Sequence, residues 1–141
     1  MSVPQTIAVD PAALPLRDRL AGRVAVVVAK RLAKRSPRRI QQALRRLRRG
    51  AAPATYAQAA AARAVVTGIS LDCTGPQGCL PRSIATALLC RLRGTWPTWC
   101  VGVRVLPPFG AHAWVVADDR DVEEPYPAGY HKALISVEPA R

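Results

Sequence analysis

The sequence has no hydrophobic run long enough to cross a membrane. Its longest unbroken apolar segment is residues 24–29, whereas a spanning helix needs about 20 apolar residues. Residues 1–10 also lack the basic start and apolar centre of a secretion signal. We therefore expect a cytoplasmic protein whose cysteines are free thiols. These cysteines are Cys73, Cys79, Cys90 and Cys100.

Closely spaced metal ligands are missing as well. Zinc sites usually place two ligands about two to four residues apart. Here the nearest cysteines are six residues apart, and the two histidines, His112 and His131, are nineteen apart. We expect no metal and no cofactor, and we expect His131 to lie on a loop.

Acidic residues are few and unevenly placed. The chain has 21 Lys and Arg against 9 Asp and Glu, which gives a net charge of +12. Thirteen of the basic residues lie within 17–49, opposed only by Asp18, and five of the acids lie within 118–124. A basic binding module for nucleic acid or an anionic membrane is therefore the competing class of function. The basic region has no aromatic residue on which bases could stack, so we expect such binding to be secondary at most.

The apolar pattern predicts helices first and strands later. At 141 residues the chain is long enough for one compact domain, with a basic helical region at 1–54 and a core at 55–141. Residues 1–15 are expected to be extended, and helices are expected over 16–34, 38–49 and 56–67, with a linker at 51–55. The first helix has apolar residues at helical spacing that we expect to face the core, with arginines on the other side. These residues are Leu16, Leu20, Val24, Val27, Val28 and Leu32.

After residue 94 the apolar period changes from that of a helix to that of a strand. Alternation predicts strands over 99–106, with one face buried, and over 112–117. A short strand is expected within 121–124, and a last one over 133–137. The fold class is therefore α+β, with the helices packed on a small antiparallel sheet.

Residues 77–84 predict a loop that delivers Cys79 to the start of a helix. Pro81 suits the first turn of that helix, and Gly94 ends it. Unpaired N–H groups and the helix dipole at this end lower the pKa of a thiol and stabilise its reactive thiolate. A free cysteine is otherwise a small buried hydrophobe. The spacing between Cys79 and a later histidine favours a catalytic nucleophile over a buried hydrophobic residue at this position.

That histidine is His112, which lies 33 residues after Cys79 at the start of a predicted strand. An imidazole there takes the thiol proton and later returns a proton to the leaving amine. An acid must hold the other ring nitrogen. Glu124 is the preferred candidate because it can return on the neighbouring strand, and Asp118 and Asp121 are alternatives.

Two further side chains are candidates for the cleft. Gln77 could lend its amide to an oxyanion hole beside the backbone N–H of Cys79. Trp114 is expected to form core or cleft wall.

Two stretches carry a family resemblance. The first stretch leads a predicted helix and reads Cys79-Leu80-Pro81-Arg82-Ser83. The second starts a predicted strand and reads Ala111-His112-Ala113-Trp114-Val115. Together they resemble the transglutaminase-like leader peptidases of lasso-peptide biosynthesis, over about residues 56–130 and more weakly through the basic helices. The resemblance implies a papain/transglutaminase-type fold, with the thiol at Cys79 and the catalytic imidazole at His112. The third member in that family is usually an aspartate about a dozen residues after the histidine, where this chain has Glu124.

The resemblance also implies partners. A chain of this size looks like the split form, which lacks its own leader-recognition domain. It would act on a ribosomally made precursor peptide brought by a separate leader-binding protein, before an ATP-dependent cyclase uses the freed amino terminus. The basic helices at 16–49 would then be a docking surface. Acyl transfer by the same Cys–His pair is the alternative reaction.

Overall fold

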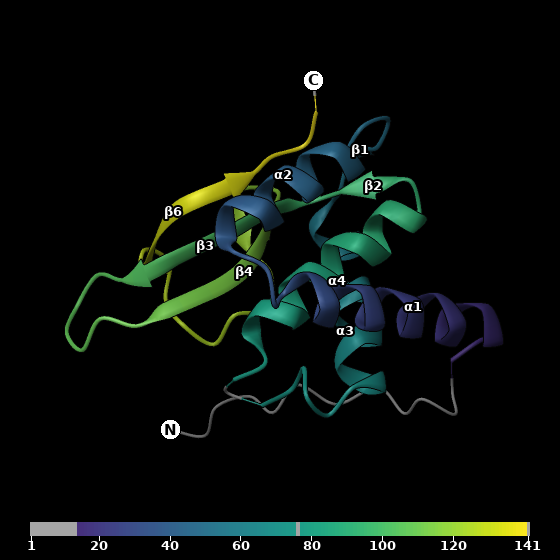
Figure 1. Cartoon of the computed structure of the whole chain (residues 1–141), viewed down its shortest axis with the longest axis horizontal. Coiled ribbons are helices and arrows are strands. Elements are labelled where there is room, and N and C mark those ends of the chain that lie inside the picture. The colour runs from purple at the N-terminus through teal and green to yellow at the C-terminus, as the bar shows by residue number, and fades with distance from the viewer. Residues whose placement is uncertain (1–13, 76, 141) are drawn as a thin grey trace.

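The structure is a computed structural model that describes residues 14–75 and 77–140 (Figure 1). Its helices are α1 (Leu16–Leu32), α2 (Pro37–Leu47), α3 (Tyr56–Ile69) and α4 (Cys79–Leu92). Its strands are β1 (Ala52–Pro53), β2 (Thr95–Trp96), β3 (Thr98–Arg104), β4 (Ala111–Ala117), β5 (Arg120–Asp121) and β6 (His131–Val137). The extended segment predicted over 1–15 falls almost wholly outside the described residues. The predicted α+β class is confirmed.

Local capping groups mark where α2 and α3 begin, whereas α1 and α4 have no side-chain cap. Ser36 accepts a hydrogen bond from the Arg39 backbone N–H, and Pro37 occupies the first turn of α2. Thr55 and Gln58 form a capping box at the start of α3. Each helix begins and ends within two residues of the range that the sequence predicts.

The main sheet is antiparallel, with strand order β5-β4-β3-β6. In the β3–β4 ladder Cys100 pairs with Trp114, and Gly102 pairs with His112. Directly opposite residues share a face, so these four lie on one side of the sheet, while Trp99 lies on the other side, against α4. Cys100 and Trp99 are both buried. The prediction that only one face of this strand is buried is therefore wrong.

The predicted linker over 51–55 is paired rather than free. Its Ala52 and Ala54 N–H groups donate to the carbonyl oxygens of Gly94 and Trp96 at 3.0 and 2.9 Å, which joins β1 to β2 in parallel. Gly94, with a φ of 86°, turns the chain after α4 and brings β2 alongside. The linker prediction is therefore wrong in part.

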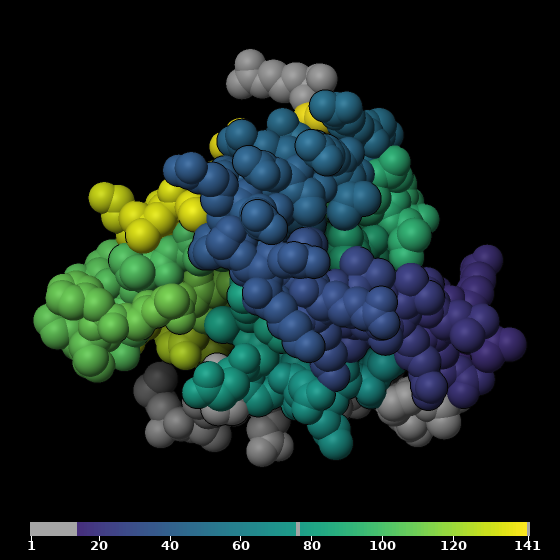
Figure 2. All heavy atoms as spheres, viewed as in Figure 1, coloured from purple at the N-terminus to yellow at the C-terminus, as the bar shows by residue number. Residues whose placement is uncertain are grey.

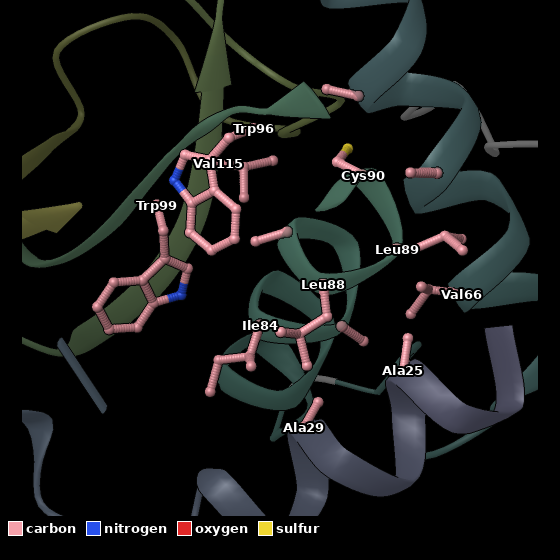
Figure 3. Close-up of a cluster of buried hydrophobic side chains, with 14 of the residues drawn as sticks. Ala25, Ala29, Val66, Ile84, Leu88, Leu89, Cys90, Trp96, Trp99 and Val115 are labelled. Atoms are coloured by element: carbon pink, nitrogen blue, oxygen red, sulfur yellow. The ribbon is translucent and has the colours of Figure 1, made fainter. Parts of the chain in front are cut away.

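The hydrophobic core surrounds α4 (Figure 3). Residues 83–90 of α4 are all buried. One side of the helix contacts α1 and α3, where Ala25 and Val66 lie, and the other contacts β4. Because α1 shares this hydrophobic cluster, the basic helical region and the remainder of the chain are packed together. None of the helices over the described part of the chain combines the length and apolarity that crossing a membrane requires.

The direction in which α1 faces differs from the prediction. Its buried residues are the small ones, including Gly22, Ala25 and Ala29, and a Cβ at Gly22 would overlap the side chain of Ile69. Close packing on α3 and α4 therefore requires this small-residue face. Leu32 packs against the core as expected and Val26 is buried, but the other predicted core residues of α1 are exposed, on a helix that lies at the front of the molecule in Figure 2. The exposed residues are Leu16, Leu20, Val24, Val27 and Val28.

We expect Trp99→Ala to lower the free energy of unfolding by about 3–5 kcal/mol. The Trp99 side chain is fully buried, and its Nε1 donates a hydrogen bond to Ser83 Oγ at 3.0 Å. Truncation would leave a cavity between β3 and α4 and would remove the hydrogen bond that Ser83 Oγ accepts, while Ser83 still donates to the Leu80 carbonyl oxygen at 2.9 Å. Urea unfolding measures the change, with Leu134→Gln on exposed β6 as the control. A loss below about 1 kcal/mol would show that Trp99 is not central to the core.

Candidate active site

Cys79 is the first residue of α4, where the backbone leaves N–H groups without helical partners. Gly78 precedes it as the cap residue and supplies no side-chain hydrogen bond. A Cβ at Gly78 would overlap the carbonyl oxygen of Asp72, so glycine is required for the loop to deliver the thiol. The half-buried Cys79 side chain therefore sits at the positive end of the helix dipole.

The amino-terminal half of β4 forms the other side of the site. The ladder of β5 with β4 covers only Val116 and Ala117, so the outer edge of β4 near His112 is left for the start of α4. There the Cys79 sulfur interacts with the His112 imidazole and accepts a backbone hydrogen bond from Ala113. The short β5 thus exposes the strand edge that receives the thiol.

These contacts change the acidity of the thiol. The hydrogen bond to His112 is the largest cause that lowers the pKa of Cys79. Burial opposes it, while the Ala113 backbone and the positive charge of Arg82 add to the lowering. Arg82 is held one turn into α4, where its Nη1 donates to the Cys73 carbonyl oxygen at 3.0 Å. The net effect favours a thiolate at the helix start.

Glu124 lies on the opposite side of the imidazole from the thiol. Its Oε1 is 3.3 Å from His112 Nε2, and the two side chains are only 5% and 12% exposed. The contact is an ion pair without the alignment of a hydrogen bond. Because Nε2 faces the carboxylate, Nδ1 is the ring nitrogen left for the thiol. Burial lowers the pKa of His112, but the contacts with Cys79 and Glu124 outweigh it and raise the pKa to about 9.

The connection between β5 and β6, residues 122–130, positions Glu124. It must cross β4 and β3, because β5 and β6 lie at opposite edges of the sheet. Val122 is buried, and its N–H donates to the Val115 carbonyl at 3.0 Å. Glu123 has a φ of 52° and accepts a hydrogen bond from the Tyr56 hydroxyl at 3.0 Å. These anchors turn the chain back toward His112.

The two aspartates predicted as alternatives lie elsewhere, whereas Gln77 is two residues before Cys79 and its oxyanion role stays a prediction. Asp118 is in the turn after β4, about 20 Å along the strand from His112, where its carboxylate accepts the Tyr56 backbone N–H at 2.7 Å. Asp121 is exposed on β5. Gln77 is exposed just before α4. The structure therefore brings Glu124, rather than either aspartate, to the histidine.

An aromatic cluster that the sequence did not reveal packs against the His112 imidazole. His131, expected on a loop, is the first residue of β6, and its ring stacks on His112 with centroids 4.4 Å apart. Trp114, which is buried, stacks on His112 at 5.6 Å, and Tyr126 meets it edge-on at 5.7 Å. The loop prediction for His131 is wrong because β6 begins two residues earlier than expected, opposite Arg104. These rings restrict the motion of the imidazole.

A cavity of about 230 Å³ opens beside the thiol and the imidazole. Its walls are mainly apolar and include Trp99, Val101 and Ile40. The corner between α1 and α2 closes it, where Arg35 and Pro37 lie. Within residues 14–75 and 77–140 no group of three His, Cys, Asp or Glu could hold a metal ion. The site thus combines a thiol, an imidazole, a carboxylate and an apolar recess.

This fold, with a cysteine at a helix start and a histidine on the facing strand, defines the papain/transglutaminase-like class. Residues 22–135 match the family described as the transglutaminase-like superfamily, and the chain belongs to it. Members of this superfamily are often cysteine-dependent enzymes, which include proteases and acyltransferases. Comparisons with curated proteins and with solved structures gave no significant match.

We expect iodoacetamide at pH 7 to alkylate Cys79 much faster than Cys90 or Cys100. The thiolate is the reacting form, and the pKa of Cys79 is lowered, whereas burial raises the pKa of Cys90 to about 11 and that of Cys100 to about 12. Peptide mapping by mass spectrometry measures each site. His112→Asn should slow labelling of Cys79 alone. Equal labelling of the three cysteines in the folded protein would contradict the lowered pKa of Cys79.

Proposed function

We propose that the protein is a cysteine endopeptidase that removes the leader peptide from a ribosomally made precursor of the lasso-peptide type. The observation that carries this proposal is the contact of His112 with both Cys79 and Glu124. The two sequence stretches that lead α4 and β4 supply the resemblance to leader peptidases. The superfamily supports cysteine chemistry, and the peptide substrate rests on the resemblance.

In the proposed reaction the Cys79 thiolate attacks the carbonyl carbon at the leader–core junction. The resulting oxyanion lies near the backbone N–H groups at the start of α4, which stabilise it. Protonated His112 gives its proton to the departing core amine, and the peptide C–N bond breaks. The leader remains as a thioester on Cys79. Neutral His112 then takes a proton from water, the hydroxide displaces the thiolate, and the leader leaves as a carboxylic acid.

Glu124 holds the imidazole in this cycle. Its buried carboxylate stabilises the imidazolium that forms when the thiol loses its proton. The raised pKa of His112, about 9, means that the imidazole is still protonated at neutral pH when the amine departs. The stacked rings of His131 and Trp114 keep the imidazole between the sulfur and the carboxylate. The proposed steps use no cofactor.

The apolar cavity next to Cys79 receives a substrate side chain near the scissile bond. Its volume of about 230 Å³ suits one aliphatic side chain. Away from the catalytic pair, Arg35 is the charged residue in its wall and favours a substrate with an acidic or carbonyl group at that end. Selectivity from so small a recess is modest, which supports delivery of the precursor by a separate leader-binding protein. The ATP-dependent cyclase would act next, and we place the reaction in the cytoplasm, where the precursor is made and thiols are reduced.

Mass spectrometry of the encoded precursor tests this proposal directly. The precursor is incubated with the protein, with and without the neighbouring leader-binding protein. Hydrolysis predicts two fragments whose masses sum to that of the precursor plus one water, and faster cleavage when the partner is present. A leader joined to an added amine would instead show acyl transfer. An intact precursor in both mixtures, with Cys79 reactive toward iodoacetamide, would refute the peptidase.

A further inference from the structure

The outer face of α1 is apolar, and the described residues of the chain leave it exposed. Its exposed aliphatic row consists of Leu16, Leu20, Val24, Val27 and Val28, which are 63%, 56%, 56%, 52% and 43% exposed. The face that the same helix buries is made mainly of glycine and alanine, with Val26, so most of its larger hydrophobic side chains are on the solvent side. A contiguous patch of this kind marks an interaction surface more often than scattered exposed residues do. Figure 2 shows α1 at the front of the molecule.

A groove runs beside the aliphatic row. It has a volume of about 590 Å³ and lies between α1 and the end of α4, lined by Arg17, Asp18, Ala21, Leu92 and Arg93. Leu92 is 61% exposed at its edge, and Arg93 pairs with Asp18 at 3.2 Å. The recess is open, with apolar and cationic groups side by side. Such a recess fits projecting side chains of a protein better than the level surface of a bilayer.

The charge around the aliphatic row is mainly positive. Five basic residues of α1 and of the turn after it are exposed, namely Arg17, Arg23, Arg31, Lys34 and Arg35. Asp18 is the only acid on α1, and Arg93 neutralises it. A second copy of the chain would bring like charges together at this face, so self-association is disfavoured. Nucleic acid would meet the arginines but would leave the aliphatic row unused. The complementary surface is therefore both aliphatic and acidic.

We propose that the aliphatic row and the groove bind an amphipathic helix with aliphatic and acidic side chains, supplied by a partner protein. Leu16, Leu20, Val24 and Val27 follow helical spacing over about 17 Å, which is the length of a three-turn helix. A helix packed along this row would place its aliphatic side chains on the valines and leucines and its carboxylates beside the arginines. The partner helix would pack along α1, and one of its side chains would enter the groove.

The position of this surface connects it to the catalytic cavity. The carboxyl end of α1 leads into Arg35, and Arg35, Pro37 and Ile40 line the recess beside Cys79. Only the part of a partner that lies over the carboxyl end of α1 is therefore near the entrance of that recess, because the groove at Leu92 and Arg93 lies at the other end of α4 from Cys79. This step rests on the proposed function, because it assigns the partner the role of presenting the precursor. The binding surface itself is defined without that role.

The test uses a synthetic 18-residue helical peptide with leucines on one stripe and glutamates elsewhere. NMR titration of the full chain should shift the amide signals of α1 and of residues 92–93. The double variant Leu20→Gln/Val24→Gln should weaken binding at least about tenfold, and 0.5 M NaCl should weaken it further. Leu134→Gln, an equally exposed leucine on β6, is the matched control and should change affinity less than twofold. A peptide of the same composition with scattered leucines should bind weakly.

Three results would overturn the proposal. They are no binding of the striped peptide, shifts confined to α2, or equal binding of the striped and scattered peptides. Vesicles of phosphatidylglycerol that bind through Leu20 and Val24 while the peptide does not would identify a membrane surface instead. Failure of the peptidase is recognised separately, because an intact precursor leaves the peptide titration unchanged. In the double variant, normal labelling of Cys79 by iodoacetamide shows that the catalytic site remains folded.

Discussion

Replacing Cys79 by alanine is expected to reduce cleavage of the precursor by about 10⁴-fold or more. Removing the nucleophile of a triad leaves only the contributions of binding and the oxyanion site. The stability should change little, because the thiol is half-buried and its loss opens no enclosed cavity in the core. Initial rates of fragment formation measure the activity, and urea unfolding measures the stability. The two readouts separate a catalytic defect from a folding defect.

Cys79→Ser provides the matched control. It keeps the shape of the side chain and a group that can hydrogen bond to His112, but a hydroxyl is a far weaker nucleophile than a thiolate at neutral pH. We expect its rate to resemble that of the alanine variant. Activity above about one-tenth of the original in either variant would show that another group attacks the peptide. In that case, the mass of the leader thioester on Cys79 would also be missing from the unmodified protein during turnover.

Glu124→Gln is expected to lower kcat by about 10²- to 10⁴-fold with a small change in KM. The carboxylate is the buried counter-charge of His112, 3.3 Å from Nε2. Its loss lowers the pKa of His112 from about 9 toward the ordinary value. Protonated His112 is the required acid, so activity of the unmodified enzyme should fall as pH rises through about 9. In the variant this alkaline decline should begin at lower pH, which a profile of kcat/KM from pH 5 to 10 would show.

Asp118→Asn removes the same charge at the other end of β4 and serves as the comparison. Asp118 caps the first turn of α3 through the Tyr56 backbone N–H, and the amide oxygen of asparagine can still accept that bond, so the stability should change by less than about 1 kcal/mol. The alkaline limb of the pH profile should stay where it is. If Asp118→Asn moved that limb and Glu124→Gln did not, the third catalytic position would belong to Asp118.

Helix boundaries could be predicted from the sequence because the signals are local. Ser36-Pro37 and Thr55 with Gln58 define helix starts by hydrogen bonds within one turn. The face that α1 presents to the core could not be predicted in this way. Leu20 and Val24 recur at helical spacing, but so do Gly22, Ala25, Val26 and Ala29 around the other side. Tight packing against α3 and α4 selects the smaller residues, and that choice depends on the neighbours.

The site was predictable in part for a similar reason. Cys79 and His112 lie at the start of a helix and of a strand, where local sequence fixes their position. The choice between Glu124 and Asp118 depended on the path of the chain after β5, including the left-handed backbone at Glu123. His131 was missed because its approach to His112 follows from strand order, with β3 between β4 and β6. Sequence spacing alone contains no record of that order.

The β5–β6 connection carries Glu124 on a stretch that belongs to no strand. Each end of this stretch is tied to the sheet, through the Val122–Val115 hydrogen bond and through the pairing of His131 with Arg104. A single proteolytic nick between Tyr126 and Tyr130 would therefore leave the ladders of the sheet in place. It would detach the Glu124 segment from β6, so that the Val122 and Glu123 anchors alone would hold the carboxylate near His112. The nicked protein would be folded by most spectroscopic criteria and yet less active, so the integrity of this one segment is a better gauge of a competent preparation than its secondary-structure content.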